Sequence, residues 1–140
     1  NLANVDARKA VLIRAELTGA DLSKADLSEA ILENASFRGA DLSGASLLIA
    51  RMKQADFSGA SLVSANIRQA IGPGVFFTGA DLTGADLRWA VLPGADFREA
   101  NLAGANLSGA DLSGTDFTRA IWTDASLCYS ASCDDRAYLD

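Results

Sequence analysis

Alanine and a large apolar residue alternate along most of the chain with a period of five residues. Counted from Val5, every fifth residue up to position 130 is alanine at 22 of 26 positions. Counted from Leu2, a second series with the same period is large and apolar at 24 of 26 positions. Asp, Asn or Ser usually stands between the two, Ser, Thr or Arg usually follows the large residue, and glycine is the commonest last residue of the unit. The register runs over 1–130 without an insertion, which predicts one repetitive domain followed by a distinct tail over 131–140.

A period of five fits neither a regular helix nor a flat strand. On an α-helix five residues advance by about 500°, so the two apolar series would not form a stripe. On a strand, side chains alternate between two faces, so the alanine that follows each leucine by three residues would point the wrong way. The conflict disappears if the chain turns a corner in every repeat, with both apolar positions inward. Eleven of the twelve glycines stand at the second corner position, where a tight turn favours a residue without Cβ.

The spacing of phenylalanine indicates how many corners make one circuit. Five phenylalanines occupy the large apolar position at intervals of twenty residues: Phe37, Phe57, Phe77, Phe97 and Phe117. Their rings can form a ladder only if twenty residues return the chain to the same side. Four repeats then make one coil, and the sequence predicts a four-sided, all-β solenoid of about 6.5 coils that stands ~31 Å tall.

The repeats resemble those of the pentapeptide repeat proteins. The likeness rests on segments such as 40–44 and 110–114, both ADLSG, and 20–24, ADLSK, and it extends over about 130 of the 140 residues. It implies a right-handed quadrilateral parallel β-helix, a fold abundant in cyanobacteria and present in the plant thylakoid lumen. It implies no known biochemical activity for most members, although one branch mimics duplex DNA and shields DNA gyrase from quinolones.

Composition and charge exclude several classes of function. The chain has no histidine, and no Gly-rich phosphate loop or metal-spaced ligand set, so we expect no enzyme and no cofactor or metal site. Its net charge of −6 argues against direct binding to nucleic acid. No apolar run approaches the roughly 20 residues that span a bilayer, so no membrane span is expected. We therefore expect a rigid repeat scaffold for protein–protein interaction.

The alternative function is a DNA mimic that binds DNA gyrase or a related topoisomerase. Outward carboxylates do recur on three sides of the predicted coil, but arginines at the corners interrupt them, among them Arg8, Arg38 and Arg88. We interpret the outward Asp or Asn simply as a solvent-facing residue, so that replacing Asp81 with Ser should be nearly silent.

One side of the predicted coil is apolar on its outer surface. Outward positions of the other three sides have only Phe76 and Ile121 as apolar residues. The fourth side and its corners gather a candidate interface: Val11, Ile13, Ile31, Ile49, Ile71, Trp89 and Val91. Such a stripe is typical of a contact surface, either for self-association or for a larger apolar partner.

Gly72 interrupts the series of large apolar residues near the middle of the chain. We expect it to leave a gap in the core, which Val75 in place of alanine and the outward Phe76 would compensate.

The two cysteines, Cys128 and Cys133, stand five residues apart near the end of the repeats. Without further ligands they make no zinc site, and they are candidates for a structural disulfide; two free thiols are the alternative. A disulfide, together with a first residue other than Met, favours an extracytoplasmic compartment such as the periplasm or thylakoid lumen over the cytoplasm. The tail at 131–140 is expected to cap the open end of the core.

Overall fold

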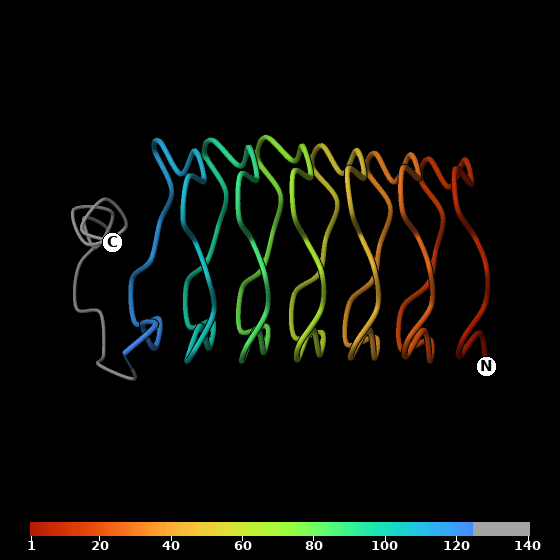
Figure 1. Ribbon diagram of the computed structural model, residues 1–140, viewed down its shortest axis with the longest axis horizontal. Coiled ribbons are helices and arrows are strands. Elements are labelled where there is room, and N and C mark those ends of the chain that lie inside the picture. Colours follow the sequence, from red (N-terminus) through yellow and green to blue (C-terminus); the bar gives the residue numbers. More distant parts are fainter. Residues whose placement is uncertain (125–140) are drawn as a thin grey trace.

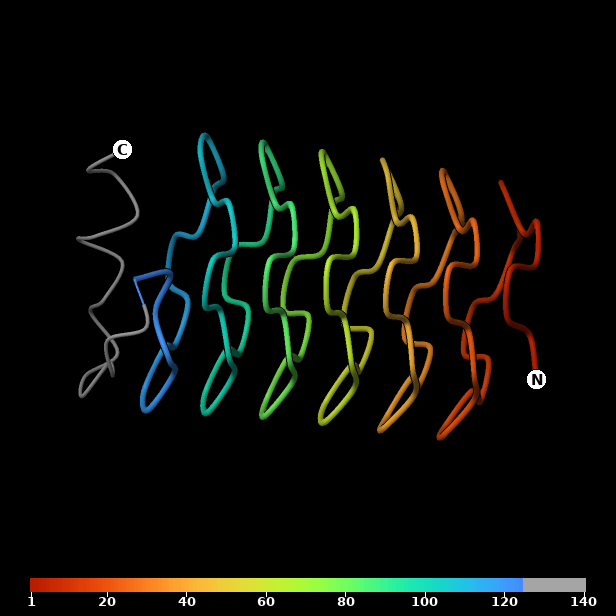
Figure 2. The same ribbon diagram turned by 60° about the horizontal axis from the view of Figure 1, so that its bottom comes forward.

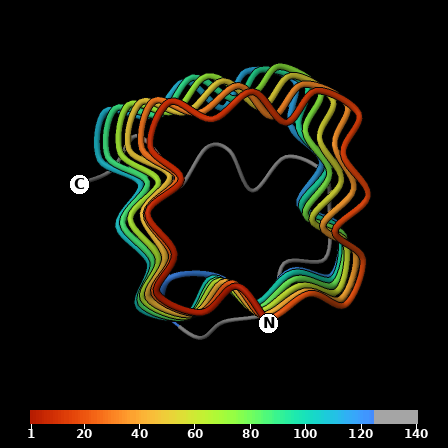
Figure 3. The same cartoon turned by 90° about the vertical axis from the view of Figure 1, so that its right-hand side faces the viewer.

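The chain winds into a four-sided coil whose turns stack along one axis. The computed structural model describes residues 1–124, and Figures 1 and 2 show the stacked coils while Figure 3 looks along the axis at their quadrilateral outline. Parallel bridges join residues twenty apart, from Asp6 and Asp26 to Asn101 and Ile121. Each side contributes one bridging residue, and residues 1–124 contain no helix and no longer strand. The predicted all-β architecture and the twenty-residue coil are therefore confirmed.

The described residues make six coils and the start of a seventh. The rest of the 6.5 coils that the sequence predicts, the tail at 131–140, and both Cys128 and Cys133 lie outside the described residues.

The corners from residues 3–4 to residues 118–119 all use the same tight turn. The amide of each inward alanine donates to the carbonyl of the preceding large apolar residue, as from Ala25 to Leu22 at 3.0 Å. Among residues 1–124, eleven glycines and thirteen other residues have positive φ, and all of them occupy the second corner position. This combination is typical of a type II turn, in which φ is positive at the third residue. The turn explains why glycine recurs at the second corner position.

Backbone hydrogen bonds join each coil to the next along the axis. Leu22 N donates to Asp41 O at 2.7 Å, and Asp41 N donates to Ala20 O at 2.9 Å. Because the same pattern repeats at each side, the polar backbone is paired between coils while the side chains at the two inward positions fill the centre. Most contacts therefore join neighbouring coils, as in other solenoids.

Alanine and the large apolar residues form one continuous core from Leu22 to Trp122. The five phenylalanines are fully buried and stack with ring centroids 4.8–5.3 Å apart. The ladder ends where Trp122 packs its ring edge-on against Phe117 at 4.8 Å. The predicted aromatic ladder is present, and its spacing matches the ~4.8 Å separation of stacked strands.

The expected gap at Gly72 is absent, and the predicted compensation by the outward Phe76 is wrong, whereas Val75 is fully buried in the core. A Cβ built on Gly72 would lie 2.9 Å from Met52 Cγ and 3.2 Å from Leu92 Cδ2. Both belong to the same column of the core, one coil before and one coil after Gly72. The long, flexible Met52 side chain fills the space instead, and Phe76 points outward with 42% of its surface exposed.

The outward Asp and Asn residues have a structural role that the sequence interpretation missed. No backbone carbonyl within residues 1–124 accepts the amide of a first corner residue. Where the outward residue two positions earlier is Asp or Asn, its carboxylate or amide oxygen accepts this bond instead, for example Asp81 from Thr83 N at 3.0 Å and Asn106 from Ser108 N at 3.0 Å. These are Asx turns, in which a short side chain replaces a backbone acceptor. The expectation that Asp81 only faces solvent is therefore wrong.

Replacement of Asp81 by Val should lower the free energy of unfolding by about 1 kcal/mol, because the Thr83 amide loses its acceptor. Replacement by Asn should be nearly neutral, since an amide oxygen can accept the same bond. Glu16→Val is the control, because Glu16 is an outward residue that caps no corner. Urea unfolding curves measure all three. Equal losses for Asp81→Val and Glu16→Val would contradict the capping role.

Candidate functional site

One side of the coil brings together the apolar residues that the sequence singled out. We call it the apolar face, and it consists of Val11, Ile13, Ile31, Ile49, Ile71, Trp89 and Val91. Bridges join its central ladder in the order Val11, Ile31, Arg51, Ile71 and Val91. Residues separated by up to 80 positions in the sequence are thereby aligned along the axis.

The side chains of the apolar face are open to solvent. Val11 is 67% exposed and Trp89 61% exposed, and of the seven only Ile31 is half-buried. Leu48, which the sequence interpretation did not include, is half-buried at the corner beside Ile49. Its position as a bulky apolar corner residue was the signal that could have revealed it. The alignment of these residues is a property of the fold, and their role in binding is a separate proposal.

Trp89 is held in place although most of it is exposed. Its ring lies against the backbone of Gly109, which occupies the same corner one coil further on. A Cβ built on Gly109 would overlap the ring atoms Cε3 and Cζ3. Because Gly109 has no side chain, the indole packs against its backbone, and this contact holds the exposed ring in a fixed orientation.

Ile49 holds a backbone conformation that its side chain disfavours. Its φ is 59°, and it is the one β-branched residue among the thirteen non-glycine residues that have positive φ in the described part of the chain. The left-handed region costs an ordinary residue roughly 1–2 kcal/mol, and a β-branched residue there is a genuine outlier. The side chain is 44% exposed, so burial in the core does not offset this cost.

Arg51 interrupts the ladder between Ile31 and Ile71. Its Nη2 donates to Glu33 Oε1 at 2.8 Å, so its charge is paired at the corner of the face. Pro73 and Pro93 lie at the same corner two and three coils beyond Glu33 and are half-buried. The face thus combines an aliphatic centre with a charged pair at one edge.

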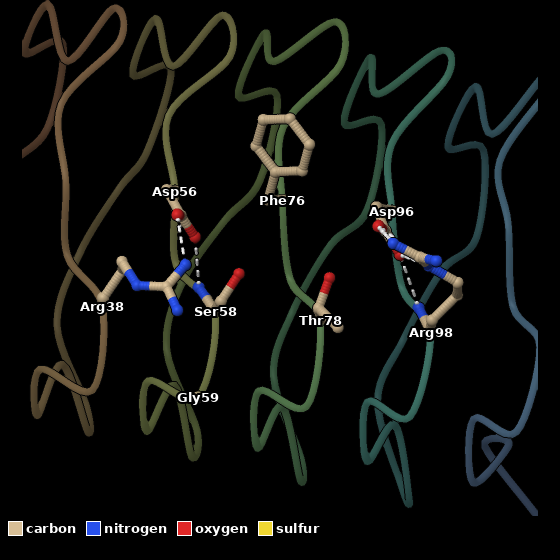
Figure 4. Close-up of a pocket in the computed structure, with 8 residues that line it drawn as sticks. All are labelled: Arg38, Asp56, Ser58, Gly59, Phe76, Thr78, Asp96 and Arg98. Atoms are coloured by element: carbon tan, nitrogen blue, oxygen red, sulfur yellow. Dashed lines mark hydrogen bonds and ion pairs between the residues drawn. The ribbon is translucent and has the colours of Figure 1, made fainter.

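A shallow pocket of about 500 Å³ lies on the neighbouring side, around the outward Phe76. Figure 4 shows how residues of four successive coils contribute to it, with Arg38 and Arg98 at its two ends. Arg38 Nη1 donates to Asp56 Oδ2 at 2.9 Å, and Arg98 Nη2 donates to Asp96 Oδ2 at 2.6 Å. Each guanidinium is matched by one carboxylate, so the pocket is electrically balanced.

The two carboxylates of this pocket stay ionised at neutral pH. Burial acts to raise the pKa of Asp56, but hydrogen bonds from Ser58 and Arg38 outweigh it and lower the pKa below its ordinary value. Burial also acts to raise the pKa of Asp96, but hydrogen bonds from Arg98 and from the Thr78 hydroxyl outweigh it and lower the pKa below its ordinary value. Neither carboxyl is suited to act as a general acid near neutral pH. The sequence interpretation missed this pocket, because Ser58 and Thr78 gave no chemical signal.

Arginine pairs with acidic residues on two of the other three sides, the side of the pocket and the side that contains Asp6 and Asp86. Arg8 donates to Asp6 through Nε and Nη2, and the side-chain hydrogen bonds lower the pKa of Asp6 to about 2. Arg88 makes the same two contacts with Asp86 and lowers the pKa of its carboxyl. The carboxylates therefore remain charged, but the guanidinium groups between them neutralise much of the local field.

Among residues 1–124 no three His, Cys, Asp or Glu side chains are grouped so that they could hold a metal ion. Nor does that part of the chain contain a helix of the length and apolarity needed to cross a membrane.

Known structures with similar coils include three pentapeptide repeat proteins. HetL, involved in heterocyst differentiation regulation in the cyanobacterium Nostoc sp. strain PCC 7120, is 32% identical over 90% of this chain and 65% of its own, with a TM-score of 0.40. A protein from the Arabidopsis thaliana thylakoid lumen is 29% identical over 99% of this chain and 73% of its own, with a TM-score of 0.32. QnrB1, a plasmid-mediated fluoroquinolone resistance protein, is 20% identical over 79% of this chain and 73% of its own, with a TM-score of 0.49.

The chain spans less than two thirds of the length of HetL. No curated protein matches it. The family model of pentapeptide repeats matches eight copies, in segments 1–34, 20–59, 35–71, 60–98 and 80–119. The fold is the right-handed quadrilateral β-helix typical of these repeats. With matched segments over most of its length, the chain belongs to the pentapeptide repeat family.

Proposed function

We propose that the chain is a non-enzymatic, rigid scaffold that binds a protein through the apolar face. The observation that carries this proposal is Ile49, which is exposed and strained at φ 59° in a position where glycine or asparagine would be relaxed. Local strain of this kind clusters at functional sites. Nothing in the core requires an isoleucine there, so a role at the surface explains it best.

The other residues of the apolar face support the same proposal. An exposed apolar patch forgoes burial worth about 25 cal/mol per Å², and such patches commonly mark contact surfaces. Tryptophan is enriched among residues that dominate binding energy. Trp89 is exposed and its ring packs against the backbone of Gly109, so the side chain loses little conformational entropy when a partner covers it. β-Propensity explains single exposed Val or Ile residues, but not their concentration on one side of four.

The test is a double substitution on the apolar face, Trp89→Ser with Val91→Asp. We expect the fold to persist, because both side chains point outward, and association with a partner or with a second copy to weaken. The matched control is Phe76→Ser with Ile121→Asp, which removes exposed apolar residues from other sides. Sedimentation velocity and pull-down from extract measure association. Equal profiles for wild type, test and control proteins would refute the proposal.

Replacement of Ile49 by Asn should raise the free energy of unfolding by about 1 kcal/mol, because Asn tolerates the left-handed region. The same substitution should weaken binding, because it removes an aliphatic side chain from the apolar face. Gln69→Asn, one coil further along the same corner, is the control and should change both quantities less. Thermal melts and binding assays on the three proteins check this. A loss of stability for Ile49→Asn would remove the strain argument.

Binding to DNA gyrase as a DNA mimic is the alternative. A mimic needs a continuous acidic stripe, and the pairs of Arg8 with Asp6 and of Arg88 with Asp86 argue against one on that side of the coil. A gyrase supercoiling assay with added protein separates the two ideas, because an interaction scaffold without this target should leave supercoiling unchanged.

We further propose that the chain works in an oxidising compartment, such as the periplasm or thylakoid lumen, with Cys128 and Cys133 as a disulfide. The support is their spacing of five residues in the sequence, which a bridge can span. Intact mass after thiol alkylation without reductant should then show no alkylated thiol, and alkylation after reduction should add two groups. Two alkylated thiols before reduction would contradict both the disulfide and this choice of compartment.

A further inference from the structure

The charges of the coil are distributed unevenly around its axis. Consider the side that contains the apolar face together with its two corners. Of the eleven Lys and Arg residues in the described part, seven lie here: Arg8, Lys9, Arg14, Arg51, Lys53, Arg68 and Arg88. Of the fifteen Asp and Glu residues in that part, only three do: Glu29, Glu33 and Asp111. Cationic side chains are therefore concentrated around the apolar face, although the chain as a whole is acidic.

Most of these cations are already paired. Arg8, Arg68 and Arg88 contact carboxylates of the adjoining side, and Lys9 and Arg51 pair with Glu29 and Glu33. Arg14 and Lys53 have no ion-pair partner among the described residues. Both are exposed, and both lie at the corner that also presents Ile13. Two unpaired cations thus stand along one edge of the apolar face.

From this arrangement we infer that the apolar face binds an acidic, amphipathic segment of another protein. Aliphatic or aromatic side chains of that segment cover Ile71, Trp89 and Val91, and its carboxylates meet Arg14 and Lys53 along the edge. The inference rests on the proposed function and adds the chemistry of the partner to it. Charge complementarity of this kind selects partners and speeds their encounter.

Charge also disfavours two other occupants of the face. A two-fold dimer through it would present the unpaired Arg14 and Lys53 of each copy to a surface that is itself rich in cations, which opposes association. An anionic membrane would attract the edge cations, but the other sides contain twelve of the described acidic residues against four basic ones and would be repelled. A discrete acidic segment can meet the face without approaching those sides.

The experiment is a display selection of random peptides of roughly 12 residues, which cover ~18 Å as a helix, on the whole chain. We expect the selected peptides to combine acidic and apolar residues. Binding of one such synthetic peptide should weaken about tenfold or more in Trp89→Ser with Val91→Asp and in Arg14→Glu with Lys53→Glu, and should weaken further as salt is raised. Lys24→Glu is the control, because Lys24 is exposed and unpaired in the described part but lies at a corner away from the face.

The outcomes separate this inference from the proposed function. The acidic partner is refuted if the peptides that depend on Trp89 and Val91 are basic, or if Arg14→Glu with Lys53→Glu does not change their binding. Either result still supports the proposed scaffold function. A selection without any peptide that depends on Trp89 and Val91 overturns both. Trp89-dependent binding to vesicles of phosphatidylserine and phosphatidylcholine, stronger than to any selected peptide, overturns the protein partner in favour of a membrane.

Discussion

Phe77→Ala is expected to lower the free energy of unfolding by about 3–5 kcal/mol, because it leaves a cavity in a fully enclosed core. Phe77 is completely buried, and its ring stacks between those of Phe57 at 5.3 Å and Phe97 at 4.9 Å. The substitution therefore removes two ring contacts as well as the buried volume. Chemical denaturation monitored by circular dichroism measures the loss.

Its neighbour in the sequence provides the control. Phe76 points outward and is 42% exposed, so Phe76→Ala should change the free energy of unfolding much less. The two substitutions delete the same side chain one position apart on the two faces of the coil wall. A larger loss for Phe76→Ala would show that the assignment of inward and outward positions is wrong.

Gly72→Leu is expected to destabilise the protein by about 1–3 kcal/mol through overpacking. The sequence pattern places leucine at this position in most repeats, so a comparison of repeats alone would suggest that leucine is favourable. The Met52 side chain already fills the space, with Cγ only 2.9 Å from the place of an added Cβ. Thermal or urea unfolding should therefore show a loss where the repeat consensus suggests a gain.

A double-mutant cycle tests whether Met52 causes this loss by occupying the space beside Gly72. Met52→Ala alone should destabilise by about 2–5 kcal/mol because it opens a cavity. Combined with Gly72→Leu, the new leucine can occupy that cavity, so the two losses should fall short of additive by about 1 kcal/mol or more. Strict additivity would mean that Met52 and position 72 do not share the same space.

The architecture could be predicted because its cause is periodic. Five residues per repeat force a corner, and the twenty-residue spacing of the phenylalanines returns the chain to the same side four corners later. The bridges of Asp6 with Asp26 and of Val11 with Ile31 follow that register. The twenty-residue period also predicts the apolar face, because residues spaced by twenty lie on the same side of the coil.

Features that depend on side-chain conformation could not be predicted in this way. The pattern shows that Gly72 lacks a side chain, but not that Met52 extends into the space. It shows Asp81 pointing outward, but not that its carboxylate bends back to the Thr83 amide. The packing of Trp89 against Gly109 likewise depends on the Trp89 rotamer and on the absence of a Cβ at Gly109, one coil away. The strain at Ile49 could have been predicted from the sequence, because the register already places this β-branched residue at a corner position that favours glycine.

Site-specific photo-crosslinking tests the central claim, that the apolar face is the binding surface, most directly. A photoreactive phenylalanine analogue placed at Ile71 reports on the apolar face, and the same analogue at Ser61 reports on the opposite side of the coil. In extract of the native compartment, we predict discrete adducts from position 71 that disappear when Trp89 is replaced by Ser, and none from position 61. Adducts from position 61 alone, or equal adducts from both positions, would contradict the claim.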